Sequence, residues 1–338
     1  MRKLILAIVL LLGILFIFSR FTEVSQVIQT INRGKWLYLI PAIFIQLIWF
    51  LNIGVSYHYL YKILGMHEKY TRLSLLSASS TFINIVAPVG GMSGITVFLN
   101  DAKYKHLSSA RVMVAGALFV LIDYIGFLCV LMIGLGILAH RNDLTAAEVG
   151  ASAFLAAGAL GLAGLVYLGM HSSSVLGAVL TWLSRKINKV VWPFIHRDYL
   201  SKDRAIQFAH DIEEGLCDLK TNPKDMILLV GLAITGKALL IGVLMMMFLA
   251  FQVPPSLDIL IAGFSIGYLF LIVSPTPQGL GVFEGVLTLT LTSLFVPLAE
   301  ATVIVIAYRG ITFWLPLVLG MIAFRSLRQK SGDKILAI

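Results

Sequence analysis

Apolar residues occupy this chain in long runs, with polar residues gathered in short stretches between them. Six runs are candidate membrane-crossing helices: 4–19, 36–61, 112–138, 147–170, 226–251 and 302–324. A helix rises about 1.5 Å per residue, so about 20 residues cross a hydrocarbon layer roughly 30 Å thick. Two more apolar stretches, 73–100 and 258–297, are interrupted by proline and glycine. The pattern predicts an all-α polytopic membrane protein.

The two interruptions resemble each other in composition, IVAPVGGMSG at 85–94 and IVSPTPQGLGVFE at 272–284. Their helix-breaking residues are Pro88, Gly90 and Gly91 in the first and Pro275, Pro277, Gly279 and Gly281 in the second. Lipid offers no hydrogen bonds, so unwound backbone at membrane depth occurs only inside protein or beside a watery cavity. Paired interruptions in two halves of a chain point to a transporter's binding site. We therefore expect membrane translocation.

The placement of the basic residues predicts the topology. The net charge is +9, and 20 of the 26 Lys and Arg residues fall inside if the N-terminus is inside and both interrupted stretches are re-entrant. If those stretches crossed fully, the basic 171–224 loop would lie outside, against the positive-inside rule. We expect both termini in the cytoplasm. No small-residue cleavage site follows the first run, so 4–19 is expected to stay as an uncleaved helix.

Re-entrant stretches predict two inverted-topology repeats, each a Pro/Gly-broken helical hairpin followed by a charged transmembrane helix. Asp123 follows Pro88 by 35 residues, and Arg309 follows Pro275 by 34. The expected organisation is a single transmembrane domain, 1–338, with repeat 1 at about 73–138 and repeat 2 at about 258–326. An inner-side polar segment at about 171–224, amphipathic in its latter half, separates them.

Four ionisable residues are expected at membrane depth: Asp123, Lys237, Glu284 and Arg309. Burying such a charge costs at least roughly 2.5–3.5 kcal/mol, so these residues are candidates for substrate binding. The guanidinium of Arg309 suits a phosphate, and the alternative is an ion pair with Glu284 or Asp123. Glu284 and Asp123 suit a cationic headgroup or a proton, although Glu284 alternatively caps a helix. Lys237 alternatively snorkels to the inner surface.

The glycines of the two interruptions are further candidates for binding, because they let a ligand approach main-chain amides at restarting helices. The alternative is tight helix packing. Glycine packing is also the interpretation of Gly263 to Gly267, GFSIG, which matches a nucleophile elbow but lies inside an apolar run with no buried histidine. No ATP-binding loop and no metal-ligand spacing are present. We expect no cofactor, no nucleic-acid partner and no enzymatic activity.

A family resemblance rests on these same residues. The runs PTPQGLGVFE at 275–284 and AYRGITFWLPLVLG at 307–320 resemble the transmembrane flippase-like domain of lysylphosphatidylglycerol synthases, and the resemblance extends to NIVAPVGG at 84–91 and to Asp123. It implies a stand-alone member, without the synthase domain, that moves lipid to the outer leaflet of a prokaryotic cytoplasmic membrane. Many relatives carry Gly-Glu and then Arg after the first interruption, whereas this chain has no charge there.

The expected function is therefore translocation of a polar-headed, phosphate-containing lipid: a phospholipid or a polyprenyl-phosphate-linked lipid. Without an ATPase, transport would run downhill or be driven by an ion gradient. The alternatives are a small-solute or ion carrier, and a scaffold for a lipid- or glycan-modifying enzyme. A membrane-embedded transferase is a third, for which no nucleophile–base pair stands out. The expected partners are the lipid and either a second copy of the chain or such an enzyme.

Overall fold

The protein is built from helices, with no strand in the part of the chain that the structure describes. The computed structural model describes residues 29–86 (except Asn32), 94–141, 144–171, 223–274 and 276–330, and also Ala178, Thr181 and Trp182. The helices are α3 (Trp36–Ile63), α4 (Tyr70–Val86), α5 (Ile95–Tyr104), α6 (Ser109–His140), α7 (Ala146–His171), α10 (Pro223–Ala250), α11 (Leu257–Val273), α12 (Val282–Ser293), α13 (Leu298–Arg309) and α14 (Leu315–Lys330).

Five helical segments are long and apolar enough to cross a membrane: Trp36–Ile63, Ser109–His140, Ala146–Leu168, Lys224–Ala250 and Leu298–Leu327. They confirm five of the six uninterrupted spans predicted from the sequence. The predicted first helix, 4–19, and the predicted amphipathic segment, about 171–224, lie outside the described residues apart from the end of α7 and isolated positions. The protein is a multi-pass membrane protein.

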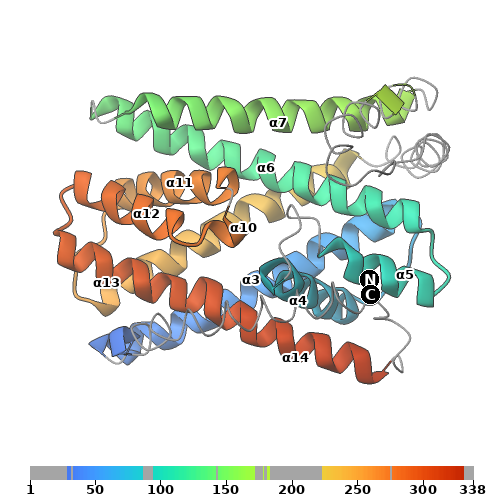
Figure 1. Cartoon of the computed structure of the whole chain (residues 1–338), viewed down its shortest axis with the longest axis horizontal. Helices are drawn as coiled ribbons and strands as arrows, with labels where there is room; N and C mark the ends of the chain where they lie inside the picture. Colours follow the sequence, from blue (N-terminus) through green and yellow to red (C-terminus); the bar gives the residue numbers. More distant parts are fainter. Residues whose placement is uncertain are drawn as a thin grey trace, which may run out of the picture.

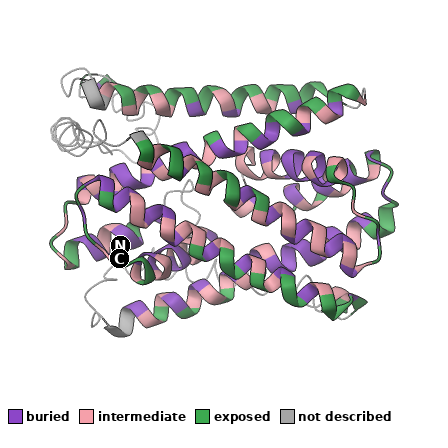
Figure 2. Cartoon of the chain, turned by 180° about the vertical axis from the view of Figure 1, so that it is seen from behind, coloured by how far each residue is buried: buried purple, intermediate pink, exposed green. Residues whose placement is uncertain are grey.

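The long helices extend along the long axis of the molecule, and α3 and α10 are inclined to α13 and α14 (Figure 1). α10 packs along α3, α14 packs along α4, and α11 packs against both α6 and α12. α7 lies along one edge, where its residues are mostly exposed or half-buried (Figure 2). The short helices α4 and α5 lie at one end of the molecule, here called the α5 end. α11 and α12 lie toward the other, here called the α12 end (Figure 1).

The two pairs of short helices correspond to the two interrupted stretches. α4 has 17 residues, α5 has 10, α11 has 17 and α12 has 12. Each is shorter than the roughly 20 residues that a membrane crossing needs. The members of each pair pack against each other, α4 on α5 and α11 on α12.

The second interruption is unwound as the sequence predicts. Ser274 ends α11 in an extended conformation (φ −61, ψ 135), which is the conformation favoured by a residue before proline. A single 3₁₀ turn, η2, then covers Pro277–Gly279. Gln278, Gly279 and Gly281 all have positive φ, at 51°, 65° and 79°. Pro275 of this interruption lies outside the described residues, as do Pro88, Gly90 and Gly91 of the first.

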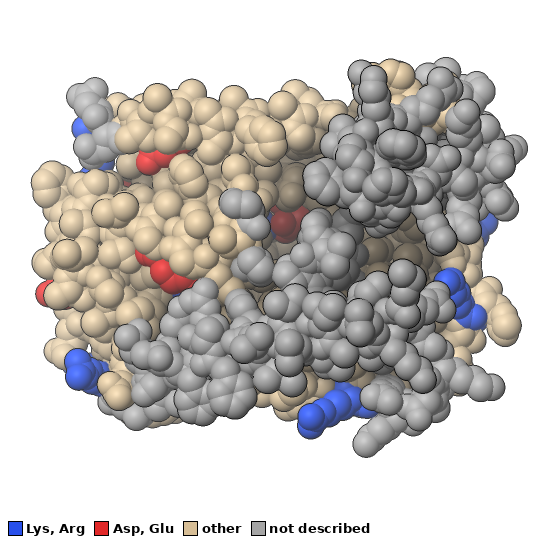
Figure 3. All heavy atoms as spheres, viewed as in Figure 1, with Lys and Arg blue, Asp and Glu red and all other residues tan. Residues whose placement is uncertain are grey.

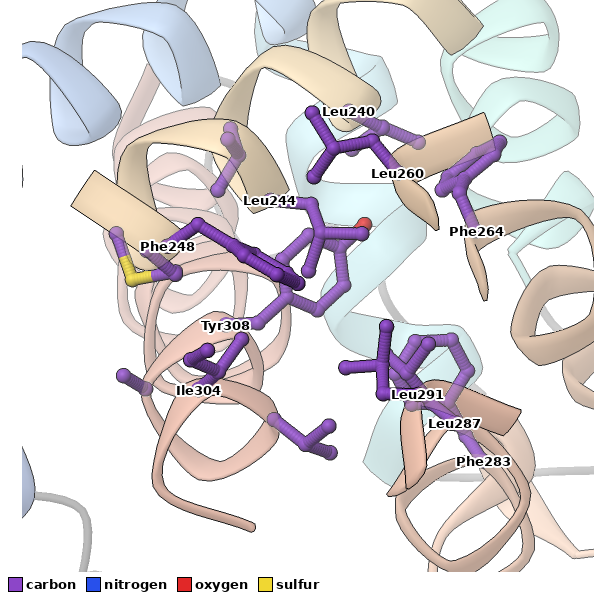
Figure 4. Close-up of a cluster of buried hydrophobic side chains, with 14 of the residues drawn as sticks. Leu240, Leu244, Phe248, Leu260, Phe264, Phe283, Leu287, Leu291, Ile304 and Tyr308 are labelled. Carbon is purple, nitrogen blue, oxygen red and sulfur yellow. The ribbon is translucent and has the colours of Figure 1, made fainter. Parts of the chain in front are cut away.

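The α12 half of the molecule contains a closely packed apolar core. Figure 4 shows members of this core from four helices: Leu244 and Phe248 of α10, Phe264 of α11, Leu287 of α12 and Tyr308 of α13. Gly263 and Gly267 lie where α11 touches α12, and a β-carbon on Gly267 would stand 3.3 Å from the β-carbon of Leu287. The motif around Ser265 is therefore helix packing, since the Ser265 hydroxyl donates to the carbonyl of Val130 within this core.

Candidate functional site

The α5 half of the molecule contains a cavity of about 740 Å³. Its walls come from α3, α4, α5, α6, α7 and α10, and Tyr268, Gln278 and Phe313 line it near the middle of the molecule. Its polar lining residues include Asn52 and Ser56 of α3 and Ser77, Ser80, Thr81 and Asn84 of α4. The cavity thus gives polar groups access to the interior of an apolar bundle.

Two hydroxyl groups of α4 that line the cavity donate to carbonyl groups of their own helix. Ser77 donates to the carbonyl of Leu73, and Thr81 donates to that of Ser77, at 2.8 and 3.0 Å. Asn84, near the end of α4, accepts a 2.6 Å hydrogen bond from the backbone amide of Gly94 and so ties the start of α5 to α4. The hydroxyl oxygens keep a lone pair for a ligand, because a hydroxyl has two.

Asp123 and Lys237 form an ion pair at the middle of the molecule. The Lys237 ammonium, 2% exposed, donates to Asp123 Oδ1 at 2.7 Å, to Asp123 Oδ2 at 2.8 Å and to the Tyr268 hydroxyl at 2.9 Å. The snorkelling interpretation of Lys237 is therefore wrong, because its ammonium is buried and donates to three acceptors inside the bundle. Asp123 is the one charged residue among the described residues that line the cavity, and its side chain is 28% exposed.

A second ion pair joins Arg309 to Glu284. Arg309 Nε donates to Glu284 Oε1 at 2.6 Å, and Arg309 Nη2 donates to the carbonyl of Gln278 at 3.0 Å. The guanidinium also lies 4.9 Å from the ring centroid of Phe283 and 4.8 Å from that of Phe313. Of the two partners considered for Arg309 from the sequence, the structure selects Glu284. Asp123 bonds Lys237 instead.

Arg309 lies beside the cavity rather than on its wall. Arg309 is 5% exposed, while Gln278 and Phe313, which it contacts, do line the cavity. Directly after Arg309 the helix widens into one π-helical turn, η3, at Gly310–Trp314. Single π-helical turns within α-helices occur frequently at functional sites. No sequence signal predicted this turn.

The glycine amides of the second interruption have partners within the protein. The amide of Gly279 donates to the carbonyl of Thr276 at 3.1 Å. The amide of Gly281 donates to Glu284 Oε2 at 2.7 Å, so Glu284 caps the start of α12 as the sequence allowed. In this conformation a backbone carbonyl and the Glu284 carboxylate accept from these two glycine amides. Figure 3 shows acidic side chains in a recess near the middle of one face.

Among the described residues, no group of three or more His, Cys, Asp and Glu side chains is placed to hold a metal ion. The sequence matches the family described as the lysylphosphatidylglycerol synthase TM region, over residues 4–320. No curated protein matches it.

Proposed function

This chain belongs to the lysylphosphatidylglycerol synthase transmembrane family, and from that premise we propose that it moves a polar-headed lipid, with phosphate in the headgroup, between the two leaflets. The cavity of about 740 Å³ carries the proposal, because it brings hydroxyl and amide side chains to the middle of an apolar bundle. Each unsatisfied polar group costs several kcal/mol in hydrocarbon, so a headgroup crosses slowly without such partners.

The finer architecture belongs to the same proposal. We take α4–α5 and α11–α12 to be re-entrant hairpins of two inverted repeats, α6 to be the charged helix of the first and α13–α14 that of the second. The shortness of these four helices supports this arrangement, as does their position at opposite halves of the molecule (Figure 1). The α5 end is assigned to the cytoplasm, because Lys62, Lys69, Arg72, Lys103, Lys105 and Arg111 lie at the helix ends there.

In this mechanism the acyl tails stay in the bilayer while the headgroup passes through the protein. The cavity lies in the α5 half, and the closely packed core of Figure 4 fills the α12 half. The asymmetry supports alternating access: the half that we assign to the cytoplasm is hollow, and the half that we assign to the outside is closed. Transport then requires the packing of α10, α11 and α12 to open when the headgroup reaches the middle.

The two ion pairs have different roles in the proposal. The Asp123 carboxylate meets either a cationic group of the headgroup or a proton, because it is the charge on the cavity wall. Arg309 meets the phosphate when Gln278 and Phe313, which lie between it and the cavity, move aside. The unwound interruption with its glycines at 279 and 281 is the segment that moves.

The experiment is leaflet exchange in liposomes that contain the purified protein, with fluorescent analogues of phosphatidylglycerol, an aminoacyl phosphatidylglycerol and a polyprenyl phosphate. Exchange of at least one lipid above protein-free liposomes is expected. Arg309→Lys, which keeps the charge but loses the planar fork, is expected to slow exchange of the phosphate-bearing probe. Folded protein that exchanges none of these lipids would overturn the proposal.

A small-solute carrier is the second candidate, because the cavity volume also lies in the range of small-ligand pockets, about 300–1,000 Å³. It predicts no lipid exchange and protein-dependent uptake of a polar solute into the same liposomes. Uptake of a mixture of radiolabelled amino acids and sugars, measured beside the lipid assay on one preparation, separates the two candidates.

A further inference from the structure

The two members of the Asp123–Lys237 pair differ in their access to the cavity. Asp123 lines the cavity, and its side chain is 28% exposed, whereas Lys237 is 2% exposed. A proton in the cavity therefore meets the carboxylate, while the ammonium is shielded behind it. Intramembrane carboxylates that face a water-filled space recur in the proton relays of pumps and transporters.

The pair joins three helices that must separate for the closed half to open. Asp123 belongs to α6, Lys237 to α10 and Tyr268 to α11. α11 leads directly into the interruption at 274–281, whose Gln278 lies on the cavity wall. A proton on Asp123 cancels the charge that holds Lys237, and a buried cation without its counter-ion is strongly destabilising. Protonation thus favours a different packing of α10 and α11 on α6.

The other titratable groups around Asp123 leave it as the proton acceptor. Tyr57 of α3, Tyr124 of α6 and Tyr268 of α11 interact electrostatically with the Asp123 charge, and all are neutral phenols near pH 7. On α5 and α7, the other helices packed against α6, the acidic groups are held elsewhere. Asp101 pairs with Arg72, and Glu148 accepts from the backbone of Thr145.

The chemistry of the second ion pair is different. Arg309 and Glu284 are not among the residues that line the cavity, so a proton in the cavity has no direct route to that pair. The arginine itself does not exchange a proton, because it stays protonated in proteins. We propose that Asp123, opposed by Lys237, is a proton-binding site that couples lipid movement to the proton gradient. The proton binds the carboxylate from one side of the membrane, and leaves the same carboxylate to the other side after the helices have moved. The inference rests on the proposed lipid movement.

The test is the steady-state distribution of fluorescent phosphatidylglycerol between the leaflets of protein-containing liposomes under an imposed pH difference. Equal potassium on both sides with valinomycin holds the membrane potential at zero. A membrane-impermeant reductant quenches the outer-leaflet probe and reports its share. The wild-type protein is expected to skew the distribution and to reverse the skew when the pH difference is reversed.

The informative variant is Asp123→Asn combined with Lys237→Met, which removes both charges and leaves no unpaired ammonium in the interior. Its distribution is expected to be the same under both pH differences. The matched control is Arg141→Met with Asp258→Asn, because that pair also joins α6 to α11 but lies at the helix ends with both side chains about a third exposed, 31% and 33%. The control is expected to keep the wild-type skew.

The outcomes separate the two proposals. If the wild-type protein exchanges lipid but the share of probe in each leaflet does not depend on the pH difference, the coupling is overturned and the proposed lipid movement is not. No exchange of any lipid removes the proposed function and the coupling with it. An infrared pH titration gives a readout independent of transport: a protonated-carboxyl band that appears in the wild-type protein on acidification and is smaller in the double variant. Equal bands in the two proteins would also overturn the inference.

Discussion

The Arg309–Glu284 ion pair joins the end of α13, directly before the π-helical turn, to the first turn of α12. Arg309 Nε donates to one carboxylate oxygen of Glu284 at 2.6 Å, and the other oxygen accepts from the amide of Gly281 at 2.7 Å. Arg309 is 5% exposed, so its charge is balanced almost wholly by groups within the protein. The carboxylate therefore stabilises both the helix start and the buried cation.

Replacing Glu284 with Ala is expected to lower the free energy of unfolding by on the order of 3 kcal/mol, because it removes the carboxylate that neutralises the buried Arg309 cation. Thermal denaturation in detergent measures the change. Glu300→Ala is the matched control, since Glu300 is an exposed carboxylate in the first turn of α13 and is expected to cost less than about 1 kcal/mol. Equal melting temperatures for the two variants would contradict the role assigned to Glu284.

The unequal burial of Asp123 and Lys237 predicts an asymmetry between single variants. Asp123→Asn is expected to cost on the order of 3 kcal/mol of stability, because it leaves a shielded ammonium without its counter-ion. Lys237→Met is expected to cost less, because the remaining carboxylate borders the cavity and can be hydrated or protonated there. Denaturation of the two single variants shows which substitution costs more stability, and the double variant completes a double-mutant cycle. A larger cost for Lys237→Met would refute the assigned geometry.

The contact between α14 and α4 depends on the absence of a side chain at Gly320. A β-carbon there would stand 2.5 Å from the carbonyl oxygen of Ala78 and 2.7 Å from the β-carbon of Phe82. Gly320→Ala is expected to destabilise the protein by about 1–3 kcal/mol, since neither neighbour is the flexible end of a side chain.

The control is Gly136→Ala on α6, where a β-carbon meets nothing within 4 Å. That substitution is expected to be neutral or to stabilise the helix by up to about 1 kcal/mol. Melting temperatures of the two variants, in one detergent, compare a tight helix contact with an open one. A drop in both would mean that the loss of glycine flexibility, rather than the α14–α4 contact, determines the cost.

The spans and the second interruption were predictable because they depend on local sequence. Runs of apolar residues set the five crossing helices, and Pro275 forces Ser274 out of the helical conformation. The capping role of Glu284 was predictable as well, since Glu284 lies three residues after Gly281 at the start of α12. The four residues of the two ion pairs were identified as candidates because charged residues are rare at membrane depth.

The pairing of Asp123 with Lys237 was not predictable. Asp123 and Lys237 are 114 residues apart. Nothing in the local sequence indicates whether the Lys237 side chain extends toward the membrane surface or turns toward the interior of the bundle. The cavity was expected only in outline, because its walls depend on which small polar residues of α3 and α4 face each other across the bundle. The π-helical turn after Arg309 had no recognisable signal in the sequence.

Narrowing the cavity and measuring leaflet exchange shows whether lipid headgroups pass through it. Ala117 of α6 lines the cavity, and Ala157 of α7 is exposed on the outer surface of the molecule. In matched liposomes, Ala117→Phe is expected to slow lipid exchange by more than about tenfold, and Ala157→Phe to exchange at the wild-type rate. Equal exchange rates for wild-type protein and folded Ala117→Phe protein would mean that headgroups do not pass through this cavity.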